Sequence, residues 1–401
     1  MQGISNKLGL RSRWTGVAGF LVTCAGMLSP LHLAAQTTTE PKGTFSGLKL
    51  GLVLDGSYAS RELALGRRAK GLGLGHTELS ASANIDDWFR GQATVALDNH
   101  EGELEVELEE AYIETLALPA GLTMRGGRFL SQIGYLNSQH LHTDDFAERP
   151  LLYRAFLGNH YFDDGIRLNY VIPTDFFWRV GVEAFNGGSL VGESTNEPSV
   201  GALTFSTRFG SDIGTNQSWQ LGLGYLRNRL NAVEEADEDE ADAENGSGDH
   251  DSEHGDEHGA AYAGKNMFIA DLVWKWAPNG NNRTRQLRLS AEYARITDLS
   301  ALAINDQRHE AWYLSAVYRF NPRWEAGVRF GDLKVSIAED DEIHRGRLQE
   351  TSLMLAYKRS EFSAFRLQFT KQNNKNEFST ATDSIMLQYV MSLGAHGAHS
   401  F

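Results

Sequence analysis

The segment 309–335, HEAWYLSAVYRFNPRWEAGVRFGDLKV, contains two runs in which apolar side chains occupy every second position. The turn-forming pair Asn321-Pro322 separates the two runs. Because successive side chains of a strand point to opposite faces, this period of two predicts an antiparallel hairpin with one apolar and one polar face. The apolar positions are Trp312, Leu314, Ala316, Tyr318 and Phe320 in the first run and Trp324, Ala326, Val328 and Phe330 in the second.

The same alternation recurs along most of the chain and predicts about sixteen strands. Most of these runs are about 10 residues long, which is the length that a tilted strand needs to cross a membrane. The strands are expected at 46–59, 74–84, 88–98, 104–115, 121–129, 162–171, 176–186, 199–209, 216–228, 266–276, 284–296, 309–320, 323–335, 347–359, 361–372 and 380–393.

A soluble β-sandwich also alternates, but its strands are typically only about 5 or 6 residues long. In this chain the polar face carries full charges in nearly every run, and aromatic side chains stand at the ends of the runs. This combination is typical of barrels in lipid, and closure removes the exposed edges that a wide sheet would have. The sequence therefore predicts an all-β fold, a transmembrane antiparallel β-barrel of about 16 strands with room for an aqueous lumen.

The links between the predicted strands differ in length. Tight links are expected at Asp86-Asp87, Pro173-Thr174-Asp175, Asn321-Pro322 and Arg359-Ser360, and long ones at 130–161, 187–198, 229–265, 297–308 and 336–346. Outer-membrane barrels have short periplasmic turns and long external loops. We therefore expect the long links to lie outside the cell.

The N-terminal region has the pattern of a secretory signal. A positive segment with Lys7 and Arg11 precedes an apolar run at 17–28 and a small residue at Ala35. The one cysteine, Cys24, lies within this signal, so the mature chain has neither disulfides nor thiolate sites. The expected division is a signal peptide at 1–35, a short N-terminal segment at 36–45 and the barrel at 46–401.

The net charge of −15 comes mainly from one segment, 234–258, which holds thirteen Asp and Glu residues and no Lys or Arg. No basic stripe suggests binding of nucleic acid. Within the segment three histidines recur every four residues among carboxylates, a mixture that suits Zn²⁺ and similar ions. The candidate metal ligands are His250, His254, His258, Asp249, Asp251, Glu253, Asp256 and Glu257. The alternatives are a solvated acidic loop or a loop that bridges lipopolysaccharide through calcium.

Several motifs lie between residues 108 and 165: Leu108-Glu109-Glu110-Ala111-Tyr112-Ile113, Met124-Arg125-Gly126-Gly127-Arg128-Phe129, Ile133-Gly134-Tyr135-Leu136-Asn137 and Phe162-Asp163-Asp164-Gly165. With the terminus at 394–401, the chain resembles the phosphate-selective porin superfamily, and within it a group of zinc-associated outer-membrane proteins with a His- and acid-rich loop. The resemblance implies a sixteen-stranded channel whose third external loop, here 130–161, folds inward as a constriction. Related channels are trimers, which makes a homotrimer an expectation by analogy.

Phosphate selectivity requires Arg and Lys around the narrow zone of such a channel. The lining expected here is mixed to acidic, so we do not carry that selectivity over. The expected lining residues are His140, His142, Asp144, Asp145, Arg149, Arg154 and His160 of the loop, with Glu105 and Glu107 of the strand at 104–115. We interpret the four at 140–145 as polar pore lining in preference to a weak metal site.

These observations predict an outer-membrane porin-like channel for small hydrophilic solutes or ions, with adaptation to divalent metal such as zinc as a finer hypothesis. The alternative is a closed barrel that binds metal or contacts other surfaces without conducting. Because no Gly-x-Ser-x-Gly motif occurs, we expect no enzyme activity. We expect no required cofactor; a divalent cation such as zinc could bind weakly. Expected partners are outer-membrane lipid and lipopolysaccharide, the barrel-assembly machinery through the terminal Phe401, and the solutes or metal ions themselves.

Overall fold

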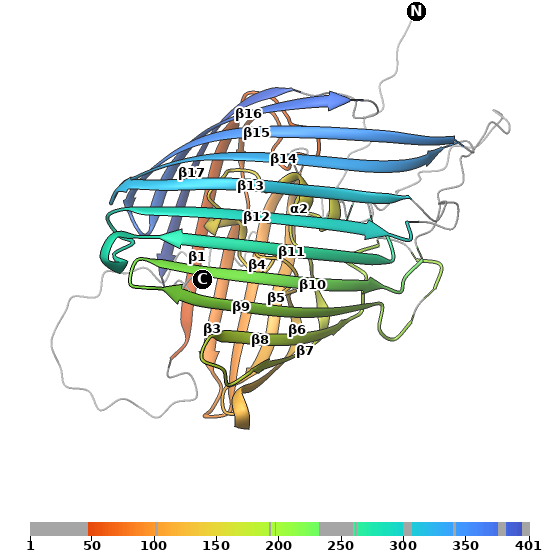
Figure 1. Cartoon of the computed structure of the whole chain (residues 1–401), viewed down its shortest axis with the longest axis vertical. Helices are drawn as coiled ribbons and strands as arrows, with labels where there is room; N and C mark the ends of the chain where they lie inside the picture. The colour runs from red at the N-terminus through yellow and green to blue at the C-terminus, as the bar shows by residue number, and fades with distance from the viewer. Residues whose placement is uncertain are drawn as a thin grey trace, which may run out of the picture. The chain divides into compact units, whose positions relative to one another are not determined.

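In the computed structural model, seventeen strands among the described residues form one antiparallel sheet that closes on itself (Figure 1). The structure describes residues 47–100, 103–191, 194–196, 198–231, 260, 263–299, 307–339, 342–375 and 382–394. The predicted signal peptide, the segment 36–45 and the acidic segment 234–258 lie outside these residues, and the predictions for them stay predictions.

The strands follow one another around the barrel in chain order. They are β1 (Lys49–Ala59), β2 (Gly71–Leu74), β3 (Thr77–Asn84), β4 (Phe89–His100), β5 (Glu103–Thr115), β6 (Leu122–Leu130), β7 (Phe162–Val171), β8 (Phe177–Phe185), β9 (Ala202–Ile213), β10 (Gln217–Asn228), β11 (Asn266–Trp276), β12 (Gln286–Thr297), β13 (Arg308–Asn321), β14 (Trp324–Glu339), β15 (Glu342–Ser360), β16 (Ser363–Lys375) and β17 (Asp383–Gly394). Short helices are η1 (Pro119–Gly121), η2 (Leu141–Thr143), α2 (Leu151–Phe156) and η3 (Pro278–Gly280).

Strand β1 closes the barrel. One of its edges pairs with β17, from Gly51 opposite Gly394 to Ala59 opposite Met386. Its other edge pairs with β3 over its first half and with β2 over its second half. Strands β2 and β3 therefore occupy one strand position between them, and the predicted sixteen-stranded antiparallel barrel is confirmed.

The two faces of the wall differ as the alternation predicts. Ser315, Arg329 and Ser352 are neighbours in register on β13, β14 and β15, and all three are buried in the lumen. The adjacent residues Leu314 and Phe330 are about half exposed on the outer face. A continuous exposed apolar surface of this kind suits contact with lipid. No helix within the described part of the chain is long and apolar enough to cross a membrane.

The two ends of the barrel have different connections. Tight turns such as 322–323 and 361–362 gather at one end, the turn end, while the segments 60–70, 131–161 and 186–201 leave from the other, the loop end. Aromatic side chains, among them Trp88, Phe177, Trp324 and Phe362, stand exposed near the turn end. They form the aromatic girdle expected at a membrane interface.

The long link predicted at 336–346 is wrong. Strand β14 continues to Glu339 and β15 starts at Glu342, and Ser336 pairs with Arg345 in the same ladder. The sequence prediction ends one strand at residue 335 and begins the next at residue 347. Backbone pairing needs no apolar face, however, so a hairpin can continue past the apolar band of the wall with a polar sequence.

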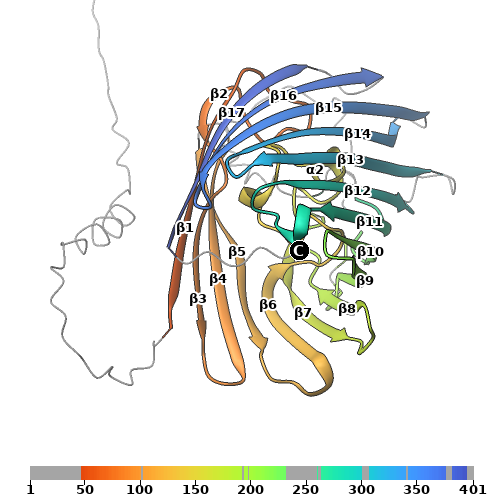
Figure 2. The same cartoon turned by 60° about the vertical axis from the view of Figure 1, so that its left-hand side comes forward.

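The segment 131–161, between β6 and β7, turns into the barrel instead of standing clear of it. Figure 2 shows α2 enclosed by the strands of the wall. The expected inward-folded loop is therefore present, with η2 and α2 as its regular parts.

Candidate functional site

The inward loop 131–161 is held by an apolar core. All six residues of α2 are buried, and Leu152, Tyr153 and Phe156 have almost no exposed surface. They belong to one apolar cluster with wall residues such as Leu333 of β14. Burying an apolar side chain of this size contributes roughly 1.5–3 kcal/mol relative to leaving it exposed. The loop is thus a packed element of the fold.

Buried charged groups also tie this loop to β14, β15 and β16. Arg154 of α2 forms an ion pair with Glu350 of β15. Arg329 of β14 donates a hydrogen bond to the backbone carbonyl of Glu148 at 2.7 Å, and Arg366 of β16 donates one to the carbonyl of Asp144. Losing one partner of such a contact would leave a buried charge uncompensated, so these groups fix the loop in place.

An irregularity between β2 and β3 directs extra side chains into the lumen. Leu74 pairs with Gly56 and Glu78 pairs with Val53, so this strand has one residue more than β1 across the break. The regular in–out alternation fails there, and three successive residues from His76 to Glu78 are all buried.

A β-bulge has the same effect in β5. Glu110 pairs with Thr94 and Leu108 pairs with Val95, which leaves Glu109 as the additional residue. Both Glu109 and Glu110 are buried. Bulges locally re-aim side chains, and here the bulge places two consecutive carboxylates on the inner side of the wall.

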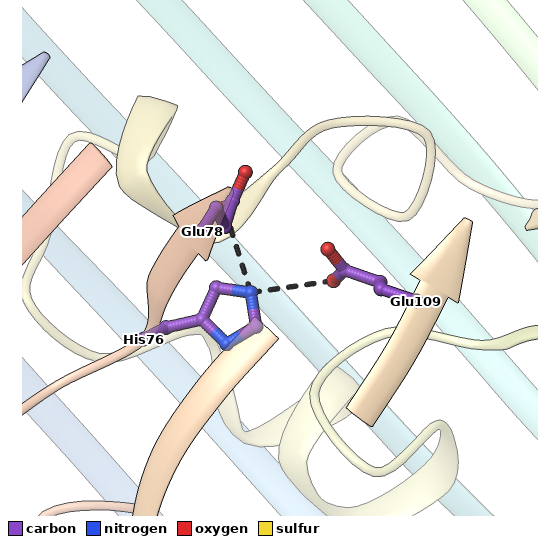
Figure 3. Close-up of side chains that lie close together, drawn as sticks. All are labelled: His76, Glu78 and Glu109. Atoms are coloured by element: carbon purple, nitrogen blue, oxygen red, sulfur yellow. Dashed lines mark ion pairs between the residues drawn. The ribbon is translucent and has the colours of Figure 1, made fainter. Parts of the chain in front are cut away.

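His76, Glu78 and Glu109 meet between these two irregular strands (Figure 3). Nε2 of His76 lies 3.4 Å from Oε1 of Glu78 and 3.4 Å from Oε1 of Glu109. One ligand atom from each residue lies within 4.8 Å of the other two. This is the spacing of groups that can share one cation.

The inward loop brings three more histidines to this point. Nε2 of His160 lies 3.0 Å from Oε1 of Glu109, and Nδ1 of His140 lies 3.1 Å from Oε2 of Glu78. Nδ1 of His142 lies 2.7 Å from Oε1 of Glu78. The lumen cluster therefore consists of His76, Glu78, Glu109, His140, His142 and His160.

Residues around the lumen cluster orient His76. Asp98 of β4 lies 2.9 Å from Nδ1 of His76. Arg67, from the segment 60–70, also pairs with Asp98. When Nδ1 carries the proton shared with Asp98, Nε2 is left as the nitrogen that faces the two glutamates.

The two loop histidines next to Glu109 differ in protonation. Burial disfavours the charged form of His140, but attraction to Glu78 and Glu109 outweighs it, and the pKa of His140 lies well above its ordinary value. Burial also acts on His160; the attraction of Glu109 does not offset burial together with repulsion from His76, and the pKa of His160 lies well below its ordinary value. His160 is therefore a neutral imidazole with a lone pair to offer near neutral pH.

The structure separates the predicted lining residues into three groups. His140, His142 and His160 take part in the lumen cluster. Four others form ion pairs that hold the loop: Asp144 with Arg149 at 2.8 Å, Asp145 with Arg288 of β12, and Arg154 with Glu350. Glu105 is exposed and Glu107 half-buried, on the face of β5 that Glu109 shares. The eight candidate ligands between Asp249 and His258 lie outside the described residues.

Three members of the lumen cluster, His76, Glu78 and Glu109, were not singled out from the sequence. Their signals were present but weak: a His-Thr-Glu triplet at 76–78, and the doublet Glu109-Glu110, which ends an alternating run of glutamates. A break in strict alternation inside a strand indicates a bulge, and bulges are frequent next to functional sites. Recognising these breaks in alternation would have directed attention to residues 76–78 and 109–110.

Open space lies beside the lumen cluster. A cavity of about 430 Å³ is lined by Arg68, Lys70, His76 and Asp98 among others. A second cavity, of about 500 Å³ and nearer the turn end, is lined by residues that include Arg179 and Arg208. The inward loop therefore does not fill the barrel from end to end.

Comparison with known proteins defines the class of the fold. No family model matches the chain. A curated relative, an uncharacterized protein of Aquifex aeolicus (strain VF5), is 27% identical over 361 residues, which cover 83% of this chain and 70% of that protein. The outer membrane channel DcaP of Acinetobacter baumannii is similar in structure, with a TM-score of 0.53 and 12% identity, covering 86% of this chain and 96% of that one.

Two other solved structures are similar to this chain over a comparable share of its length. OprB of Pseudomonas putida has a TM-score of 0.54 at 12% identity, covering 86% of this chain and 94% of that one. An anion-selective porin from Comamonas acidovorans has a TM-score of 0.52 at 12% identity, covering 87% and 99%. The chain thus has the sixteen-stranded fold of outer-membrane porins.

Proposed function

We propose that this protein is a diffusion channel of the outer membrane for small hydrophilic solutes or ions, and not an enzyme. The observation that carries the proposal is a closed barrel with a charged and polar inner face and an apolar outer face. A wall of this kind admits water and polar solutes to the lumen while its outside contacts lipid. The inward loop 131–161 acts as the constriction.

The distribution of charge on the wall supports selection by charge. Carboxylates gather on β3 to β5, around the lumen cluster, while Arg125, Arg167, Arg179 and Arg208 occupy the inner face of β6 to β9. Three of these arginines pair with carboxylates, for example Arg167 with Glu183 at 2.6 Å. Rings and sectors of charged side chains are how pores discriminate among ions.

Single-channel recording of the full chain in planar bilayers tests the proposal. We expect stable conductance whose ion selectivity is set by both charge sectors. Protein that inserts and is correctly folded but gives no conductance would contradict it.

A closed binding protein is the second candidate, because α2 and its neighbours form an extensive apolar cluster inside the barrel. A lumen sealed by this packing would bind ligand without passing ions. Ligand binding by folded protein in the absence of conductance would favour this reading over the channel.

We also propose, as a finer level of the same function, that divalent ions such as zinc are among the solutes. The acidic and histidine-rich segment 234–258 supports this, since negative charge at a pore mouth raises the local concentration of cations. Conductance that responds to micromolar zinc only when this segment is present would agree with it. Kinship with phosphate-selective porins, trimer formation, contact with lipopolysaccharide and signal cleavage stay predictions.

A further inference from the structure

We propose that the lumen cluster binds a divalent transition-metal ion, for which Zn²⁺ is the probe, and that this ion fastens the inward loop to β3 and β5. Its ligands are Nε2 of His76, one carboxylate oxygen each of Glu78 and Glu109, and Nε2 of His160. The site does not rest on the proposed channel function, because metal binding can be measured on solubilised protein that conducts nothing.

The environment of Glu109 is the first reason to expect a metal ion. Its side chain is fully buried, and neither carboxylate oxygen accepts a hydrogen bond. A buried carboxylate is strongly unfavourable unless cations neutralise it, and Nδ1 of the nearby His140 lies 3.4 Å from its Oε2 without a hydrogen bond. Imidazole nitrogens of His76 and His160 stand 3.4 and 3.0 Å from its Oε1 without hydrogen-bond geometry. A metal ion between these atoms would bind all of them at once.

The orientation of His76 is the second reason. Its Nδ1 lies 2.9 Å from Asp98 and 3.2 Å from the guanidinium of Arg67, while Nε2 is buried, has no hydrogen-bond partner and faces two carboxylates. Histidines that bind metal usually donate the other ring N–H to a carboxylate, which fixes the tautomer and the direction of the ring. Asp98, His76 and the two glutamates reproduce that arrangement.

Distances give the third reason. Zinc–nitrogen and zinc–oxygen bonds of about 2.0–2.1 Å place neighbouring ligands of a tetrahedral ion about 3.3–3.4 Å apart. His76 Nε2 is 3.4 Å from an oxygen of Glu78 and 3.4 Å from an oxygen of Glu109. His160, whose Nε2 lies 3.0 Å from Oε1 of Glu109, would have to turn towards the other three ligand atoms to complete the tetrahedron.

The ligand set indicates the class of ion. Imidazole with carboxylate suits zinc and its neighbours in the first transition series, whereas calcium and magnesium prefer oxygen ligands alone. The cavity of about 430 Å³ that His76 and Asp98 help to line gives the ion a way in.

Such an ion would join two parts of the fold. His76, Glu78 and Glu109 belong to the wall, while His160 lies at the end of the inward loop, directly before β7. The ion pair of Arg154 with Glu350 holds the same loop to another sector of the wall. Metal occupancy would therefore fix the constriction from a second side.

The test uses the full chain folded in detergent, stripped with chelator, equilibrated with Zn²⁺ and freed of excess metal by gel filtration before zinc is counted. Wild type should retain one equivalent more than Glu109→Gln and His76→Gln. His309→Ala, which removes a buried lumen histidine of β13 outside the lumen cluster, should keep the wild-type content. The segment 234–258 is present in every variant, so its own binding cancels in the comparison. Equal zinc contents in wild type and folded Glu109→Gln would overturn the proposal and leave an ion-pair cluster of protonated histidines.

X-ray absorption on a chain that lacks the segment 234–258 but has no point substitution gives an answer even if the variants fail to fold. At one equivalent of Zn²⁺ the proposal expects four nitrogen and oxygen ligands at about 2.0 Å, with outer-shell scattering from imidazole. A six-coordinate, water-rich shell at that loading would overturn it.

Discussion

Arg154 and Glu350 are separated by 196 residues in the chain, yet they form an ion pair inside the barrel with side chains only 0% and 3% exposed. Arg329 lies 3.2 Å from the other oxygen of Glu350, so one carboxylate is shared by two guanidinium groups. This contact joins α2 to β14 and β15. It is one of several buried contacts that fix the inward loop, beside the apolar cluster around α2 and the hydrogen bond of Arg329 to the carbonyl of Glu148.

Glu350→Gln should therefore destabilise the barrel and loosen its constriction. The substitution leaves two buried arginines uncompensated, which typically costs about 3–5 kcal/mol. We expect urea titration to show a loss of that size in the free energy of unfolding. We also expect single-channel currents that are larger and noisier than those of the wild type.

Glu310→Gln is the matched control. Glu310 pairs with Arg308 at 2.8 Å, and the arginine is about half exposed. An exposed pair of this kind contributes about 0–1 kcal/mol. Equal stability of the two variants, or currents in Glu350→Gln identical to wild type, would show that Glu350 does not hold the loop.

Asp98→Asn should weaken zinc binding without removing a ligand. Carboxylates that orient a metal-binding histidine typically change metal affinity about 10–100-fold when substituted. We expect a loss of that size in competition titrations against a chromophoric chelator. Asp332→Asn is the control, because Asp332 is also a buried lumen aspartate but pairs with Arg347 on β15 at 2.6 Å. The same affinity in both variants would argue against the role given to Asp98.

The strands could be predicted because the pattern that defines each one lies within its own short stretch of sequence. Lipid outside and polar lumen inside impose a strict period of two, so the runs around Leu314 and Val328 could be recognised without any partner. The inward loop could be expected from its length and from the resemblance. Its residues Arg149 and Arg154 lie in this segment, and their ion partners Asp144 and Glu350 could not be named from the sequence.

The lumen cluster could not be predicted in the same way. His76 and Glu109 point inward because each lies at an irregularity that breaks the period on which the sequence argument depends. Their meeting with His160 depends on how the loop folds back, which no local pattern records. The error at 336–346 has a different cause, because the backbone pairing of β14 with β15 continues there through a polar segment.

Gly127→Ala should destabilise the junction of β5 and β6. Gly127 has φ +122°, a conformation that residues with a Cβ rarely adopt, and a Cβ there would clash with the carbonyl oxygen of Ala111. Strain and overpacking together should cost roughly 2–4 kcal/mol in the free energy of unfolding. Gly126→Ala is the neighbouring control, since a Cβ at Gly126 would meet nothing within 4 Å. The idea fails if the two alanine variants unfold at the same urea concentration.

The outer face can be tested for lipid contact at the middle of β13. Leu314 is about half exposed there and stands beside Phe330 of β14 on the same face. An arginine on the lipid face near the midplane of a bilayer costs about 2–4 kcal/mol, and much less near its edges. Leu314→Arg should therefore lower the free energy of unfolding from lipid vesicles by that amount, and Leu314→Ala, which shortens the side chain without charge, should lower it less. Arginine tolerated as well as alanine would place this face away from the hydrocarbon, and the outward apolar surface would then need a covering other than lipid.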